Sequence, residues 1–150
     1  MNNQQVRPSG GEGYGAALDN FFDAEMRYVA EGGAEAGASF AEMGAHLHPE
    51  VCLHQGPSVP FPGDWVGTDG VERFFGAFSQ TFQSLDLSEV RYFVGDVGVA
   101  VSLCMKAVAR ATGRHVDARV AQVIVFDNEL MRDWTVFYLD PVNVTDATRP

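Results

Sequence analysis

The sequence predicts a single α+β domain in which three N-terminal helices pack on a strongly curved antiparallel sheet. Two patterns predict this class: apolar residues recur at three- and four-residue steps in the first half of the chain and alternate in the second half. The length of 150 residues suits one domain, and a hydrophobic content of 46% with 11 Phe supplies a core.

The three helical segments differ in length. The first starts at Tyr14 and ends at the glycine pair 32–33. The second is short, opens with a capping box of Ser39 and Glu42, and ends near Leu47. The third begins at Thr68 or Asp69, and its apolar stripe needs a broad apolar partner. That stripe consists of Val71, Phe74, Phe75, Phe78 and Phe82.

The strand-like segments occupy the rest of the chain. A first run covers 51–55 and is followed by a loop rich in Pro and Gly, after which four runs cover 87–94, 99–111, 115–126 and 130–140. Short turns join these four, which predicts antiparallel pairing. We expect one domain over 14–141, a flexible tail over 1–13 and a loose tail over 142–150.

Charge and composition exclude several classes of protein. Ten basic and 20 acidic residues give a formal charge of −10, which repels nucleic acid and anionic membrane surfaces. We expect no membrane span, no cofactor and a cytoplasmic location. Cys52 and Cys104 lie in strand-like runs, and we expect both to be reduced thiols. A disulfide between them is the alternative. We expect no metal site, because His46, His48 and His54 lack suitable spacing.

The order of these elements resembles a known group of proteins. With the segments HPEVCLH at 48–54, GTDGVERFF at 67–75 and VFDNELMRDW at 125–134, residues 14–141 resemble the ketosteroid isomerase and SnoaL-like polyketide cyclase group of the nuclear transport factor 2-like superfamily. The resemblance implies a cone that encloses a pocket for an apolar small molecule. It also implies a homodimer that forms through the outer face of the sheet.

Two glutamines stand out in this frame. Alternation puts Gln122 on the apolar face of its strand, and Gln55 on the face of Val51 and Leu53. A buried amide either braces its neighbours or contacts a ligand. The resemblance implies that Gln55 replaces the general-base Asp of the isomerases and Gln122 the Asp of their oxyanion hole. Glutamine cannot transfer a proton, so other groups must carry acid–base chemistry.

Three titratable residues are the candidates for that chemistry. Glu25 shares the buried face of the first helix, although a solvated position at the edge is the alternative. Asp133 interrupts the apolar face of the last strand and is expected to point inward. His54 lies near the predicted pocket mouth, although its position in the alternation points it outward, where it would be structural.

Four aromatic residues complete the candidate ligand-binding set, with core packing as the alternative for each: Trp65, Tyr28, Trp134 and Tyr138. The first of these lies in the loop before the third helix, which could serve as a lid. The predicted function is a cofactor-independent acid–base enzyme of the isomerase, cyclase, dehydratase or epoxide-opening type. The alternative is a non-catalytic binding protein that uses the two glutamines as neutral anchors.

Overall fold

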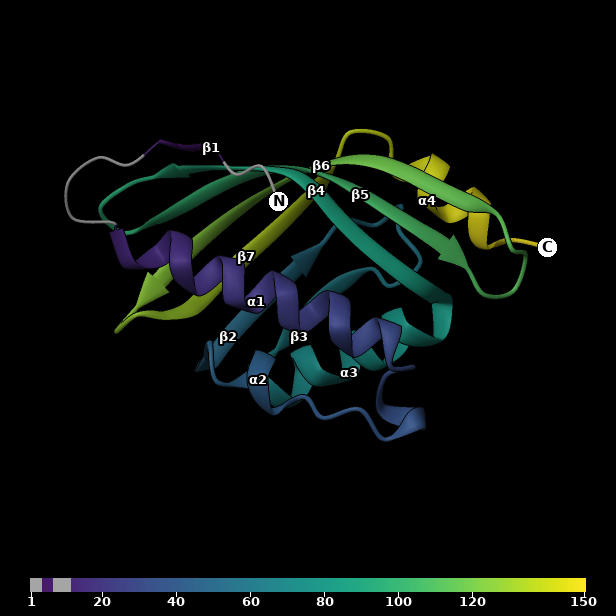
Figure 1. Cartoon of the computed structure of the whole chain (residues 1–150), viewed down its shortest axis with the longest axis horizontal. Coiled ribbons are helices and arrows are strands. Elements are labelled where there is room, and N and C mark those ends of the chain that lie inside the picture. Colours follow the sequence, from purple (N-terminus) through teal and green to yellow (C-terminus); the bar gives the residue numbers. More distant parts are fainter. Residues whose placement is uncertain (1–3, 7–11) are drawn as a thin grey trace.

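The computed structural model describes residues 4–6 and 12–150, in which three helices cover one face of a long, bent sheet (Figure 1). The helices are α1 (Glu12–Ala30), α2 (Ala41–Gly44), α3 (Gly67–Thr81) and α4 (Pro141–Thr148), with a 3-10 turn at Ala34–Ala36. The strands are β1 (Gln4–Val6), β2 (Leu47–Gln55), β3 (Gly63–Val66), β4 (Phe82–Val94), β5 (Gly98–Ala109), β6 (His115–Asp127) and β7 (Leu130–Tyr138).

The described strands form one sheet in the order β1-β4-β5-β6-β7-β2-β3. Strands β4 to β7 pair antiparallel in sequence order, as their short connections predict. Two pairings depart from the predicted antiparallel sheet, because β2 runs parallel to β7 and β1 runs parallel to β4. The α+β class and the curved sheet are confirmed, and the sheet is mostly rather than wholly antiparallel.

The core lies between α1, α3 and the concave face of the sheet (Figure 1). The predicted stripe on α3 is buried, and Phe75 is 1% exposed. Its ring lies 5.0 Å from that of Phe74 and 6.2 Å from that of Trp134. Phe21 of α1 meets Trp134 edge to face at 5.3 Å. Packed rings therefore fill much of the space that the cone encloses.

The segment before α3 is more ordered than its sequence predicts. Part of the expected loop forms β3, and two further side chains of that loop, Val59 and Phe61, are buried. The second helix is shorter than predicted, because strand β2 already begins at Leu47 and continues through Pro49. Glu42 of the expected capping box instead pairs with Arg27 of α1.

The C-terminal segment is more ordered than its sequence predicts. Residues 142–150 were expected to be loose, yet most of them form α4, which packs on β6. Asp140 caps this helix by accepting a 3.2 Å hydrogen bond from the backbone N–H of Asn143. Val144 and Ala147 are buried against the domain, and this burial offsets the entropy of ordering the segment.

The N-terminal segment is described only in part. The predicted flexible tail over 1–13 falls mainly on residues 1–3 and 7–11, which lie outside the described residues. Gln4–Val6 of that stretch pairs with Arg91–Phe93 of β4 as β1. Residues 12 and 13 already belong to α1, so the helix begins earlier than predicted.

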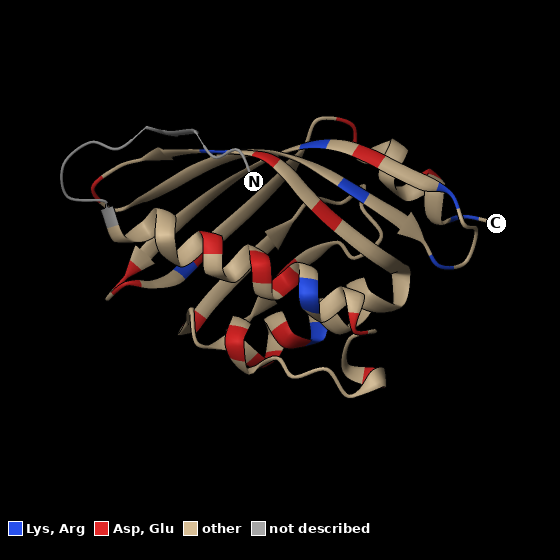
Figure 2. Ribbon diagram, viewed as in Figure 1, with Lys and Arg blue, Asp and Glu red and all other residues tan. Residues whose placement is uncertain are grey.

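Charge is unevenly distributed over this fold. Acidic residues follow α1 and the elements beneath it, whereas several basic residues lie toward the ends of the long strands (Figure 2). Cys52 and Cys104 are both free thiols. In the part of the chain that the structure describes, none of the helices has the length and apolar character that crossing a membrane requires.

Candidate functional site

The two predicted inward glutamines lie in one row on the concave face of the sheet. Gln122 of β6 pairs with Val136 of β7. On the other side of β7, His54 of β2 pairs with Thr135, so the same parallel register places Gln55 beside Val136. Both amides are buried, each 7% exposed. We call these three neighbours, Gln122, Val136 and Gln55, the amide row.

The two amides of this row differ in their hydrogen bonds. The side-chain oxygen of Gln122 accepts a 3.0 Å hydrogen bond from the indole N–H of Trp134. The side-chain oxygen of Gln55 is buried and has no hydrogen-bond partner among the described residues. Since an unsatisfied buried oxygen costs roughly 1–3 kcal/mol, Gln55 retains an acceptor that a ligand can satisfy. The side-chain oxygen of Gln122 is therefore hydrogen-bonded to Trp134 within the core, whereas that of Gln55 can accept a hydrogen bond from a ligand.

A buried carboxyl group faces this region from α1. Glu25 is 8% exposed, and burial raises its pKa from 4.5 to about 8. No hydrogen bond to its carboxyl group occurs among the described residues. Tyr138 of β7 lies close enough to Glu25 for the two side chains to interact. Burial and the negative charge of Glu25 both raise the pKa of the Tyr138 phenol. One helical turn before Glu25, Phe21 packs on Trp134. Of the two positions that the sequence leaves open for Glu25, the structure shows the buried one.

A cleft opens beside the amide row. It has a volume of about 170 Å³ and is lined by residues 56–59, 136–138 and Pro141. Gln55 immediately precedes this lining, and Val136 belongs to it. Thr145 of α4 donates a 2.6 Å hydrogen bond to the backbone oxygen of Ser58, which ties α4 to one wall. The cleft therefore lies between the loop after β2, the end of β7 and the start of α4.

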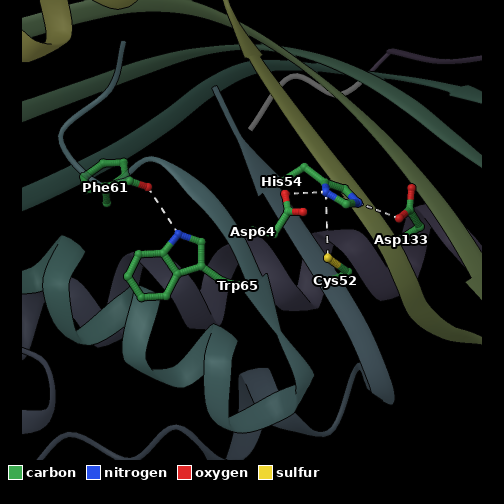
Figure 3. Close-up of polar contacts among 6 residues, drawn as sticks. All are labelled: Cys52, His54, Phe61, Asp64, Trp65 and Asp133. Carbon is green, nitrogen blue, oxygen red and sulfur yellow. Dashed lines mark hydrogen bonds and ion pairs between the residues drawn. The ribbon is translucent and has the colours of Figure 1, made fainter. Parts of the chain in front are cut away.

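A second cluster of polar side chains lies on the opposite face of the same strands (Figure 3). The Nδ1 atom of His54 is 2.8 Å from a carboxylate oxygen of Asp64, and its Nε2 atom is 2.8 Å from one of Asp133. The Sγ atom of Cys52 is 3.7 Å from Nδ1 of His54. Hydrogen bonds to Asp133 and Asp64 raise the pKa of His54. A protonated imidazole between two carboxylates accounts for this geometry.

Two predicted proton carriers therefore lie outside the cone. The inward position predicted for Asp133 is wrong, because an extra residue at Arg132 shifts the register between β6 and β7. That bulge turns Trp134 inward and Asp133 outward, where its side chain is 50% exposed. His54 faces outward as strand alternation predicts, and its side chain is 33% exposed. Of the three candidates, Glu25 is the buried one.

The predicted aromatic residues divide between core and cleft. Trp65 lies in β3 and not in a free lid loop. It is half-buried, packs against Phe74, and donates a 3.2 Å hydrogen bond to the backbone oxygen of Phe61 (Figure 3). Tyr28 is 2% exposed, and its ring packs edge to face on that of Phe40 at 6.0 Å. Trp134 is buried core, whereas Tyr138 contributes to the cleft.

Sequence reasoning missed one member of the outer cluster. Asp64 lies in the segment that was predicted to be a loop, so no partner strand was assigned to it. In the structure this segment pairs antiparallel with β2, and Asp64 lies directly opposite His54. The run Asp64-Trp65-Val66 after Gly63 was the available signal, since a glycine followed by aromatic and β-branched residues suits a short strand.

The family follows from comparison with known proteins. The model of the SnoaL-like domain family matches residues 26–134, so the chain belongs to the SnoaL-like domain family. This confirms the resemblance inferred from the sequence. None of the curated proteins matches the sequence.

Solved structures confirm the fold. A nuclear transport factor 2-like protein from Burkholderia xenovorans superposes with a TM-score of 0.74 at 12% identity, over 95% of this chain and 100% of that one. A provisionally assigned polyketide cyclase from a Silicibacter species gives 0.72 at 15% identity, over 92% and 98%. A provisionally assigned isomerase from Rhodopseudomonas palustris gives 0.68 at 14% identity, over 87% and 94%.

Proposed function

We propose that this protein is a cofactor-independent acid–base enzyme that acts on a small apolar molecule bound inside the cone. The reaction would be of the isomerase, cyclase, dehydratase or epoxide-opening type. The observation that carries the proposal is the Glu25 carboxyl group, which is buried and whose pKa is raised to about 8. A group whose pKa lies near neutral pH can both accept and donate a proton during turnover.

The surroundings of Glu25 suit that role. Tyr138 offers a phenol whose raised pKa keeps it protonated as a hydrogen-bond donor. Gln55 offers an unsatisfied acceptor for a substrate hydroxyl group. Glu25 would take a proton from a carbon or hydroxyl group of the substrate and return it at a later step, while these neutral groups hold the substrate oxygen.

The size of the cleft limits the substrate. Its volume of about 170 Å³ is below the roughly 300 Å³ at which ligand pockets commonly begin. A compact molecule therefore fits better than a steroid unless the wall formed by residues 56–59 moves. That wall is exposed at Gly56, Pro57 and Ser58 and is held by Thr145 of α4. The cleft next to the amide row supports binding of a small apolar ligand.

A non-catalytic binding protein is the second candidate, and the hydrogen bonds of the amides favour it. Gln55 and Gln122 occupy the inner face without carboxylates in the row, and Gln122 is already committed to Trp134. In this alternative Glu25 stays protonated and serves as a neutral hydrogen-bond donor to the ligand. Binding would then persist without turnover.

We also propose that the protein is a cytoplasmic homodimer that forms through the outer face of the sheet. Support comes from an apolar patch on that face, which consists of Val123, Val125, Phe137 and Leu139, exposed by 36% to 82%. A groove of about 350 Å³ between β6 and β7 is lined by Phe137 and Leu139. Sedimentation equilibrium tests this: the wild type should be a dimer, and Phe137→Asp should be a monomer.

Proton exchange tests the enzymatic proposal. The purified chain is incubated in D₂O with small enolisable ketones such as cyclohexenone, and loss of the α-proton signal is followed by NMR. We expect catalysis that rises with pH and levels off above about 8, since the ionised Glu25 is the base. Glu25→Gln should lower the rate by roughly 10²- to 10⁴-fold while binding, measured by ligand-observed NMR, persists.

The variant separates the two candidates. Full activity of Glu25→Gln would remove Glu25 from the mechanism. Binding by the wild type of every ketone tested, without exchange at any pH, would favour the non-catalytic protein. Gln122→Glu is the matched control, because it adds a carboxyl group to the inner face at the bracing position and should not restore turnover to Glu25→Gln.

A further inference from the structure

We infer that Cys52, His54 and Asp64 form a binding site for one divalent transition-metal ion of the Zn²⁺ class, with Asp133 as the residue that orients the histidine. The site lies on the outer face of the β2–β3 hairpin (Figure 3). It is separate from the inner amide row and does not depend on the proposed enzymatic function.

The donor atoms already lie close enough for one ion. The Sγ of Cys52, the Nδ1 of His54 and a carboxylate oxygen of Asp64 lie within 4.8 Å of one another. Ligands bound tetrahedrally at 2.0–2.3 Å from zinc lie about 3.3–3.6 Å apart. The Sγ–Nδ1 distance is 3.7 Å and needs little change. The Nδ1–oxygen distance is 2.8 Å and must widen by roughly 0.5 Å, which the rotation of an exposed Asp64 side chain allows.

Backbone pairing fixes the three ligands. Cys52 and His54 share a face because they are two residues apart on β2. Asp64 of β3 lies directly opposite His54 in the antiparallel register. Directly paired residues in such a ladder bring their side chains within contact distance. The site is thus built on two hydrogen-bonded strands, which give it a defined geometry.

The second nitrogen of the histidine has the partner that metal-bound histidines typically have. The Nε2 of His54 lies 2.8 Å from a carboxylate oxygen of Asp133. When Nε2–H donates to that carboxylate, Nδ1 carries the lone pair and points toward Cys52 and Asp64. Asp133 comes from β7, so a bound ion would join three strands. Asp133 acts here as a positioning residue.

The electrostatics favour a cation. Asp64 and Asp133 each place a carboxylate oxygen 2.8 Å from a ring nitrogen of His54, so acidic side chains surround the donor atoms. On binding, a divalent ion would displace the Nδ1 proton of His54 and the thiol proton of Cys52, both of which leave to solvent. The combination of sulfur, imidazole and a single carboxylate suits Zn²⁺ or Co²⁺ better than Mg²⁺ or Ca²⁺, which prefer oxygen ligands. One coordination position would face solvent.

Cobalt binding tests the site, because Co²⁺ reports its ligands by absorption. Chelator-treated protein is titrated with Co²⁺. We expect one equivalent to bind, with the near-ultraviolet charge-transfer band of a cobalt–thiolate bond and the intense visible bands of four-coordinate Co²⁺. Cys52→Ser should abolish the charge-transfer band. Asp133→Asn should keep the band and weaken binding by roughly 10- to 100-fold.

Two matched variants control for other sites. Cys104→Ser removes the second free thiol, which lies away from β2, and His48→Gln removes a histidine that lies 3.5 Å from Asp127. Both should bind Co²⁺ as the wild type does. The proposal is overturned if Cys52→Ser keeps the charge-transfer band, if Cys104→Ser loses it, or if wild-type Co²⁺ is six-coordinate without a thiolate band.

A measurement on the wild type avoids any folding defect of the variants. The rate of alkylation of Cys52 by iodoacetamide is followed by mass spectrometry with and without one equivalent of Zn²⁺. We expect Zn²⁺ to slow the reaction at Cys52 at least tenfold, because the metal-bound thiolate is a weaker nucleophile. An unchanged rate would overturn the site.

Discussion

Carboxyl groups lie in different environments on the two sides of strands β2 and β7. On the inner face, Glu25 meets the sheet without a hydrogen-bond partner among the described residues, and burial alone raises its pKa to about 8. On the outer face, Asp133 is half-exposed and is paired with His54 at 2.8 Å. Burial without a partner therefore produces a carboxyl group able to exchange protons near neutral pH. Hydrogen bonds to carboxylates at partial exposure instead favour the charged form of His54.

The largest difference between the two faces is expected in the free energy of unfolding lost when an aromatic side chain is removed. Phe75→Ala removes a ring that is 1% exposed and packs against Trp134, and it should lower the free energy of unfolding by about 3–5 kcal/mol. Phe93→Ala, at an outer position that is 41% exposed, is the matched control and should cost much less. Urea denaturation measures both. Equal losses would mean that the inner rings are not closely packed.

The buried carboxyl group should make stability depend on pH. Folding raises the pKa of Glu25 from 4.5 to about 8, so the folded state binds this proton more tightly. Its contribution to stability is complete below pH 4.5 and is lost as the pH rises toward 8. At about 1.4 kcal/mol per pKa unit, the loss is on the order of a few kcal/mol. The difference in unfolding free energy between wild type and Glu25→Gln, measured from pH 4 to 9, should follow this trend. A constant difference would contradict it.

The hydrogen bond that braces Gln122 should contribute less. Trp134→Phe removes the indole donor and leaves the Gln122 oxygen buried, at a cost of roughly 1–3 kcal/mol. Trp65→Phe is the matched control, because it removes an indole hydrogen bond to the backbone oxygen of Phe61 at a half-buried site. Thermal unfolding should rank Trp134→Phe as the more destabilised variant. The reverse order would mean that the hydrogen bond between Trp134 and Gln122 contributes little to stability.

The smallest effect is expected at the outer histidine. In metal-free protein the NMR titration of His54 should have its midpoint above 6.5, because Asp133 and Asp64 bond the imidazolium. Burial should lower the midpoint of His46 below 6.5. The stability from His54 is complete below pH 6.5 and disappears as the pH rises through its raised pKa, and it should be below about 1 kcal/mol. A His54 midpoint below that of His46 would refute the pairing.

The sequence predicts the fold and part of the site. Alternation along β6 and β2 correctly places Gln122 and Gln55 inside, since every second side chain shares a face. Helical periodicity likewise places Glu25 on the buried face of α1. These predictions succeed because each depends on one regular element.

The failures involve pairing between elements. Strand alternation assigns Asp133 to the inner face, but a bulge at Arg132 reverses the parity, and a bulge leaves no clear mark in the sequence. Asp64 and the C-terminal helix were missed because their order comes from contacts with β2 and β6. The outer cluster joins β2, β3 and β7: Asp133 is distant in sequence from its partners, and Asp64 meets His54 only through the pairing of β3 with β2.

The ionisation of Glu25 decides whether it can carry a proton inside the domain. Carbon-13 NMR of protein labelled at glutamate side-chain carboxyl carbons follows this group through pH, and Glu25→Gln identifies its signal. We expect a midpoint near 8, well above the 4.5 of an ordinary glutamate. A midpoint near 4.5 would mean that the carboxyl group is solvated or paired, and Glu25 could not then serve as the proton carrier of an enclosed site.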